Sequence, residues 1–232
     1  MNPLILALDT DNLDTACSWI EATNESIKTY KAGLEFFLTF GDKGIERLRS
    51  AGEFDLFLDL KLHDIPNTVA SATKAISHIK PKFLTVHASG GSEMIAAAAT
   101  AAPSIDITAV TILTSLTAEN VRAIGYSQPP LESAINLASL AVDSGARAIV
   151  CSPLEVSSIR ERIGRETTII TPGVRPAGSS LGDQNRVMTP RDAINAGSTY
   201  LVLGRPITSL YSEGLGAMSA KAREILDDAT SA

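Results

Sequence analysis

The sequence predicts an α/β protein with the (β/α)₈ barrel fold, and three observations lead to this prediction. Short, mainly apolar runs that are typical of β-strands recur eight times along the 232 residues. Segments with the apolar spacing of helices separate these runs, and such alternation indicates a parallel sheet. Eight units in a chain of this length fit a closed barrel better than an open doubly wound sheet, and no GxGxxG motif follows the first strand to support a dinucleotide-binding fold.

The predicted strands follow one another at fairly even intervals. They cover Leu4–Leu8, Thr29–Gly33, Leu56–Leu62, Phe83–His87, Ile107–Leu113, Ala148–Cys151, Thr168–Thr171 and Tyr200–Leu203. Each is short and bounded by polar or turn-forming residues, as expected for buried strands.

Helices are predicted between the strands and after the last one. They cover Leu13–Ala22, Phe36–Arg49, Thr68–Ile79, Ser92–Ala101, Leu131–Ser144, Pro153–Ile163, Pro190–Ala196 and Glu213–Asp227. We find no linker and no low-complexity run, so residues 1–232 are expected to form one barrel domain.

Composition excludes several classes of protein. Hydrophobic residues make up 44% and charged residues 20%, which is ordinary for a soluble globular protein. The formal charge of −6 argues against a nucleic-acid partner, and no apolar run approaches the length of a membrane span. The two cysteines, Cys17 and Cys151, provide neither a disulfide framework nor metal-ligand spacing. We therefore expect a cytoplasmic protein that binds neither nucleic acid nor membrane.

One predicted strand carries charges where a strand should bury hydrocarbon. In Asp55–Leu62 the leucines occupy one face, and Asp59 and Lys61 share the other. Ionised groups in such a place are costly unless they are paired. Asp64 follows just past the strand, where Pro66 marks the turn into a helix.

Further charges occupy matching positions on other strands. Barrel enzymes place their sites at the C-terminal ends of the strands, where Asp9 follows the first strand and Lys31 lies in the second. The second and third strands are neighbours in such a barrel, so Lys31 is expected beside Asp59. Alternating signs would keep these groups ionised. An ionic network that only fixes strand register is the alternative, but such networks seldom improve stability over apolar packing.

A phosphate site is predicted after the seventh and eighth strands, where this fold commonly binds phosphate. Thr171–Arg175 and Gly204–Ile207 each combine glycine, which permits close approach of the backbone, with arginine, which matches phosphate oxygens. The long polar stretch Arg175–Thr189 is predicted to be a lid, and Gln184 within it could donate to the phosphate. Ser115 could bind a ligand or cap a helix.

Together these motifs resemble the orotidine 5′-phosphate decarboxylase family over nearly the whole chain. The resemblance is most specific in Asp59–Thr68 (DLKLHDIPNT), and Ala7–Asp9, Tyr30–Gly33, Thr171–Arg175 and Leu203–Ile207 add to it. It implies decarboxylation of orotidine 5′-monophosphate to UMP and CO₂, the last step of UMP synthesis. It also implies that there is no metal and no organic cofactor, and that the enzyme is a homodimer whose active site is shared across the interface.

The resemblance also implies roles for the charged residues. Lys31, Asp59 and Lys61 would come from one subunit and Asp64 from its partner, with Asp9 and Lys31 on the ribose hydroxyls. On chemical grounds Lys61 is the candidate for stabilising and protonating the C6 carbanion, because nothing in the sequence suggests a cofactor that could act as electron sink.

Binding roles are implied for residues outside this cluster. Ile65 and Thr68 would reach across the interface, Ser115 would contact the pyrimidine amide, and Pro172 would pack near the ring. The phosphate would be held by Arg175, Gln184, Arg205 and the amide of Gly204.

Two rival interpretations remain at this point. A related metal-dependent sugar-phosphate enzyme would share the Asp-x-Lys-x-x-Asp core but turn its acids toward Mg²⁺, and the continuation Ile65–Thr68 favours the orotidine interpretation. A non-catalytic binder of a phosphate ligand would not need a lysine flanked by two acids.

Overall fold

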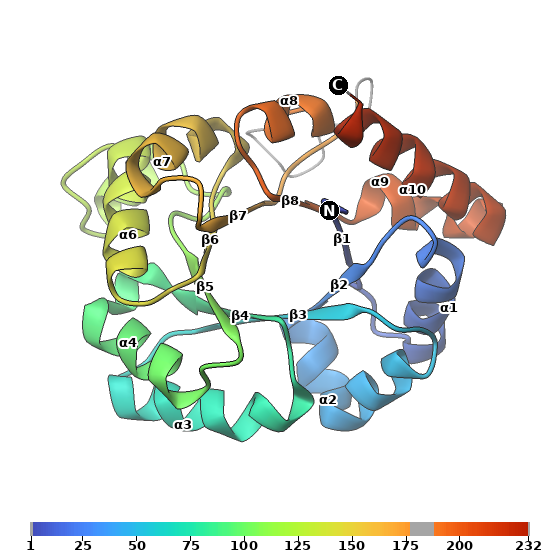
Figure 1. The fold of residues 1–232 in the computed structure, drawn as a ribbon, viewed down its shortest axis with the longest axis horizontal. Helices are drawn as coiled ribbons and strands as arrows, with labels where there is room; N and C mark the ends of the chain where they lie inside the picture. The colour runs from blue at the N-terminus through green and yellow to red at the C-terminus, as the bar shows by residue number, and fades with distance from the viewer. Residues whose placement is uncertain (1, 177–187, 232) are drawn as a thin grey trace.

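A computed structural model describes residues 2–176 and 188–231, and its centre is a closed barrel of eight parallel strands in sequential order (Figure 1). The strands are β1 (Leu4–Ala7), β2 (Thr29–Gly33), β3 (Asp55–Leu62), β4 (Phe83–His87), β5 (Asp106–Val110), β6 (Ala148–Val150), β7 (Thr168–Thr171) and β8 (Tyr200–Leu203). Pairing of β1 with β8 closes the barrel. The predicted (β/α)₈ fold is confirmed.

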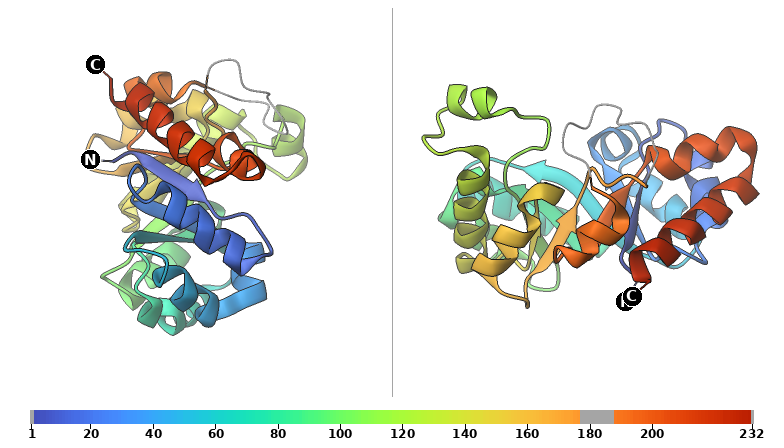
Figure 2. Two further views of the ribbon diagram at one scale, coloured as in Figure 1. Left: turned by 90° about the vertical axis from the view of Figure 1, so that its right-hand side faces the viewer. Right: turned by 90° about the horizontal axis from the view of Figure 1, so that it is seen from above.

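Helices form a ring outside the barrel (Figures 1 and 2). The α-helices are α1 (Leu13–Thr23), α2 (Leu34–Arg49), α3 (Pro66–Ile76), α4 (Ser92–Ala101), α5 (Ala118–Ala123), α6 (Pro130–Asp143), α7 (Val156–Ile163), α8 (Pro190–Asn195), α9 (Arg205–Thr208) and α10 (Leu215–Thr230). Short 3₁₀ turns, η1 (Ser77–Ile79), η2 (Ala88–Gly90), η3 (Pro153–Glu155) and η4 (Ser209–Glu213), adjoin some of them.

The hydrophobic core has two parts. The larger part packs the outer faces of the strands against the helices. The smaller part fills the barrel interior with side chains from six different strands, namely Ile5, Phe57, Phe83, Ala148, Ile170 and Tyr200. The ring of Phe83 contacts those of Phe57 and Tyr200 edge-on, with centroids 5.8 and 5.5 Å away. This packed layer forms a floor beneath the C-terminal ends of the strands.

The structure corrects several predicted boundaries. The strand predicted over Ile107–Leu113 ends at Val110. Among the described hydrogen bonds, the Thr111 amide is the last of this segment to bond to β6, and the chain then leaves the barrel. The last helix begins at Leu215 rather than Glu213, since Gly214 has a φ of 109° and turns the chain into it.

Helix α5 was not predicted. It is six residues long and projects with its loop from one end of the barrel (Figure 2). Thr117 and Asn120 cap its start by reciprocal side-chain to backbone hydrogen bonds. A helix this short has too few residues to display a periodic apolar face, so it is missed when periodicity is the signal.

Two predictions about the chain as a whole can be compared with the described residues. None of the described helices has both the length and the apolar character that crossing a membrane requires. Cys17 and Cys151 are both free and buried.

Candidate active site

The site is built around an irregularity at the end of β3. The pairing of β3 with β4 shifts register between Leu58 and Leu62, and within this stretch Lys61 has a φ of 49°. The left-handed region costs a non-glycine residue about 1–2 kcal/mol. Irregularities of this kind redirect a side chain out of the regular alternation of a strand. Here the irregular stretch carries Lys61, whose side chain lies beside Asp59.

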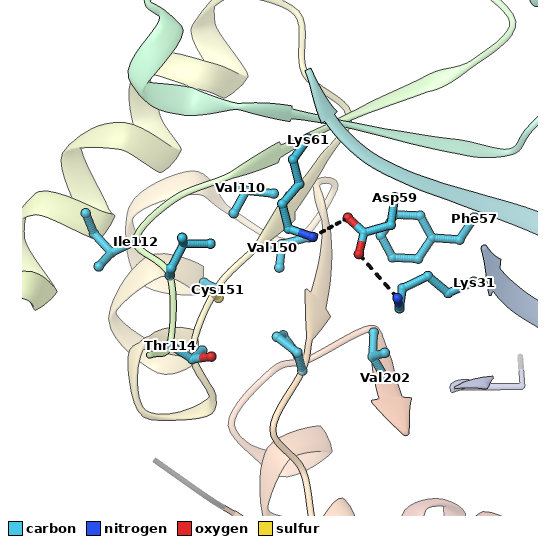
Figure 3. A pocket seen from close by; sticks show the side chains of 12 residues that line it. Lys31, Phe57, Asp59, Lys61, Val110, Ile112, Thr114, Val150, Cys151 and Val202 are labelled. Atoms are coloured by element: carbon cyan, nitrogen blue, oxygen red, sulfur yellow. Dashed lines mark hydrogen bonds and ion pairs between the residues drawn. The ribbon is translucent and has the colours of Figure 1, made fainter. Parts of the chain in front are cut away.

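Four side chains of alternating charge lie in a row at this end of the barrel (Figure 3 shows three of them). The Asp9 carboxylate lies 3.2 Å from the Lys31 ammonium, which lies 3.4 Å from Asp59 Oδ2. The Lys61 ammonium donates to the other oxygen, Asp59 Oδ1, at 2.8 Å. The structure thus brings Lys31, Asp59 and Lys61 together and adds Asp9 to them.

Each ion in this row stabilises its neighbours. Asp59 is 8% exposed, and burial alone would raise its pKa, but Lys31 and Lys61 outweigh that effect and hold the pKa below its ordinary value. Burial of Lys31 opposes its charge, yet the carboxylates of Asp59 and Asp9 raise its pKa above the ordinary value. These directions keep Lys31 and Asp59 ionised at neutral pH.

Thr85, in β4, belongs to this cluster and was missed in the sequence. Its hydroxyl accepts a hydrogen bond from the Lys61 backbone amide at 2.8 Å and donates one to Asp59 Oδ1 at 3.0 Å. Threonine is common in strands, and its spacing relative to the charged residues carries no signal. Only the three-dimensional pairing of β3 with β4 identifies it.

A cavity of about 180 Å³ opens beside the charged row. Its polar lining includes Lys31, Asp59, Lys61 and Thr114, and most of the remaining wall is apolar. Pro172, which follows β7, also lines the cavity. Small-molecule sites commonly combine apolar walls with a few convergent polar groups.

The loop after β5 presents Thr114 to the cavity rather than Ser115. Thr114 lines the cavity, whereas Ser115 is exposed and is not among the described lining residues. Both residues lie in the turn after β5, where the alternation of a strand no longer fixes which side chain points inward.

Of the predicted phosphate residues, Arg175 lies in the loop after β7 and Arg205 is the first residue of α9, which follows β8. Burial and the nearby positive charge of Arg205 lower the pKa of Arg175, which indicates that the two guanidinium groups are close. Gly204 precedes Arg205 at the end of β8. Gln184 and most of the predicted lid lie outside the described residues.

Asp64 and Ile65 lie just before α3, and Thr68 lies in its first turn. All three are exposed, with Ile65 at 66%. Asp64 Oδ1 accepts a hydrogen bond from the Ile65 amide at 2.7 Å, and none of the three is among the described residues that line the cavity.

Acidic and imidazole side chains in the described part of the chain do not converge on a common point. No group of three or more His, Cys, Asp or Glu side chains there could hold a metal ion. Asp59, which would be a ligand in the metal-dependent alternative, has both oxygens engaged by lysines and Thr85.

Comparison with known sequences identifies the family of this chain. The sequence model of the family described as "Orotidine 5'-phosphate decarboxylase / HUMPS" matches residues 2–213. The chain belongs to this family. Its membership confirms the resemblance that the motifs indicated.

Individual proteins named orotidine 5′-phosphate decarboxylase are similar to this chain over nearly its whole length. The chain is 48% identical to orotidine 5′-phosphate decarboxylase of Thermobifida fusca over 220 residues, covering 95% of this chain and 94% of the other. It is 42% identical to the enzyme of that name from Gluconobacter oxydans, covering 99% and 98%. The crystal structure of orotidine 5′-phosphate decarboxylase from Lactobacillus acidophilus superimposes with a TM-score of 0.86 at 34% identity, covering both chains fully.

Proposed function

We propose that this protein decarboxylates orotidine 5′-monophosphate to UMP and CO₂ in pyrimidine biosynthesis. The observation that carries the proposal is the alternating row Asp9, Lys31, Asp59 and Lys61, three of which line a largely apolar cavity. Family membership and the named relatives support the same reaction.

The chemistry requires a cation at the reacting carbon. Cleavage of the bond between C6 and the carboxylate releases CO₂ and leaves the electron pair on C6, where no π system is positioned to delocalise it. Decarboxylases usually rely on a cofactor as electron sink. We assign the stabilising charge and the proton that forms the new C6–H bond to Lys61, with no metal and no organic cofactor involved.

Asp59 would serve as the partner that orients this cation. Its hydrogen bond holds the Lys61 ammonium at 2.8 Å, and its charge would lie near the departing carboxylate and disfavour the ground state. We assign the larger share of catalysis to Lys61, because a fixed cation acts where charge develops in the transition state. Lys31 completes the row by keeping Asp59 ionised.

Recognition of the rest of the nucleotide would involve several loops. Asp9 and Lys31 would bind the ribose hydroxyls, and Pro172 would pack near the ring. For the pyrimidine amide we propose Thr114 in addition to Ser115, because Thr114 lines the cavity. The phosphate is assigned to Arg175, Gln184, Arg205 and the Gly204 amide.

We further propose a cytoplasmic homodimer with a site shared between subunits. Asp64, Ile65 and Thr68 are exposed on a single chain, and the 66% exposure of Ile65 is large for an aliphatic side chain. In the dimer these residues would enter the partner's site, and Asp64 would extend the charged row beyond Lys61.

One assay tests this function against its two rivals. Orotidine 5′-monophosphate is incubated with the protein in EDTA, and loss of its ultraviolet absorbance is followed with UMP formation. We expect full activity in EDTA. Mg²⁺-dependent turnover of a sugar phosphate, with no turnover of orotidine 5′-monophosphate, would support the metal-dependent alternative. Binding of orotidine 5′-monophosphate without turnover of either substrate would indicate a recognition protein.

A further inference from the structure

Thr85 makes two hydrogen bonds whose directions are fixed by their chemistry. The backbone amide of Lys61 can only donate, so the Thr85 hydroxyl accepts from it at 2.8 Å. The hydroxyl has one proton, which is therefore free to point at Asp59 Oδ1, 3.0 Å away. An ionised carboxylate can only accept, so both bonds are satisfied at once.

These contacts close a ring through Lys61. The ammonium of Lys61 donates to the same Asp59 Oδ1 that accepts from Thr85. One hydroxyl thus connects the backbone of Lys61, through Asp59, to the charged end of its own side chain. The connection occurs where the register of β3 and β4 shifts and where Lys61 has a φ of 49°.

The backbone there needs such support. A left-handed residue persists in a protein when the surrounding structure over-determines its conformation. Thr85 has no exposed surface, whereas the side chain of Lys61 is 30% exposed. Thr85 therefore has no surface from which to touch a substrate, and any effect it has on the reaction must pass through Lys61 and Asp59.

We propose that Thr85 is a positioning residue, which holds the Lys61 ammonium and the Asp59 carboxylate in the geometry that decarboxylation requires. The inference rests on the proposed role of Lys61 and adds the device that orients it. Its chemical requirement is a hydroxyl that accepts and donates at the same time, so serine can replace threonine and valine cannot.

The test compares Thr85→Val with Thr85→Ser. Valine has nearly the same shape, but it leaves the Lys61 amide without its acceptor and removes a donor from Asp59. We expect kcat to fall about 10- to 100-fold in Thr85→Val, as for loss of hydrogen bonds to a charged group. The KM for orotidine 5′-monophosphate and the Kd for UMP should change less than about twofold, because Thr85 does not contact the bound nucleotide. Thr85→Ser should recover most of kcat.

Thr108 provides a matched control. It pairs with Thr85 on the neighbouring strand, is fully buried, and its hydroxyl donates to the Asp106 carbonyl at 2.9 Å. Thr108→Val makes the same chemical change in the same barrel and should keep the wild-type kcat. If Thr85→Val does not fold, Thr85→Ala is compared with Thr85→Ser in the same way.

Several results would overturn the inference. A Thr85→Val enzyme with wild-type kcat, a serine variant as slow as the valine variant, or an equal loss in Thr108→Val would each do so. Measuring Lys61→Ala in the same assay separates the inference about Thr85 from the proposed role of Lys61. An inactive Lys61→Ala with a fully active Thr85→Val removes the role of Thr85 alone, and an active Lys61→Ala removes the role of Lys61.

Discussion

Asp59 is the residue on which the charged row depends. It is buried, it accepts from Thr85, and each of its oxygens faces a lysine. Replacing a buried ionic network with apolar side chains is often neutral or stabilising. We therefore propose that this network serves the reaction, because Asp59 holds the Lys61 ammonium in place beside the cavity.

Removing the charge of Asp59 should change how stability depends on pH. Its folded pKa lies below the ordinary value of an aspartate, so ionised Asp59 contributes stability at neutral pH and loses the contribution as pH falls through the folded pKa. We expect Asp59→Asn to be less stable than wild type by about 3 kcal/mol at pH 7, because it leaves two lysines without their shared carboxylate.

Urea unfolding of both proteins measures this difference. It should be constant between about pH 7 and pH 5 and shrink in more acidic buffer. A difference that widens as pH falls would mean that Asp59 is destabilised as an anion, contrary to the direction assigned to its pKa.

At the scale of elements, the end of β3 combines a strained backbone with a charged side chain. Lys61 and Lys80 are the non-glycine residues with positive φ in the described chain, at 49° and 52°. Lys80 ends the η1 turn, where such a conformation is a common way to terminate a helix. At Lys61 the same conformation accompanies a register shift beside the cavity.

Substitution by glycine should reveal this strain. Lys61→Gly is expected to be more stable than Lys61→Ala by about 1 kcal/mol, because glycine adopts the left-handed region without steric cost. Lys80 also has a positive φ but lies outside the charged row, and Lys80→Gly should exceed Lys80→Ala in stability by a similar amount. Thermal unfolding measures both pairs, and an alanine variant as stable as the glycine variant at position 61 would show that the conformation is unstrained.

The loops after β7 and β8 should contribute binding energy without taking part in bond breaking. We expect Arg205→Ala to lower kcat/KM for orotidine 5′-monophosphate about 10- to 100-fold, as for loss of a charge-assisted hydrogen bond. Orotidine without phosphate is the control substrate, and wild type and variant should turn it over equally. An equal loss on both substrates would place Arg205 outside phosphate recognition.

Features of this protein that follow a regular sequence pattern could be predicted, and those that depend on a local irregularity could not. The strands of the barrel and the proximity of Lys31 to Asp59 follow from apolar runs and parallel pairing, which are regular. The left-handed Lys61, the hydroxyl of Thr85 and the inward side chain of Thr114 depend on local irregularities that no periodicity encodes. Helix α5 was not predicted because its six residues are too few to show a periodic apolar pattern.

At the scale of the whole molecule, the exposed start of α3 is the surface that we propose enters the partner's site. A mixture of Asp64→Asn and Lys61→Ala proteins tests the proposal. Each is expected to be inactive, but a hybrid dimer would combine an intact Lys61 from one subunit with an intact Asp64 from the other. Random exchange makes half the dimers hybrid with one good site of two, so activity should return to about a quarter of wild type.

The control is a mixture made without subunit exchange, which should stay inactive. Exchange itself is followed by tagging one variant and recovering the other with it. Absence of recovery after verified exchange would argue that each site is complete within one subunit.

The most direct test of the account is kcat of Lys61→Ala with orotidine 5′-monophosphate in EDTA. The variant should fold, bind UMP and lose about a thousandfold or more in kcat, because a fixed charge at the developing carbanion is removed. Turnover within about tenfold of wild type would contradict the central claim that this ammonium stabilises and protonates C6.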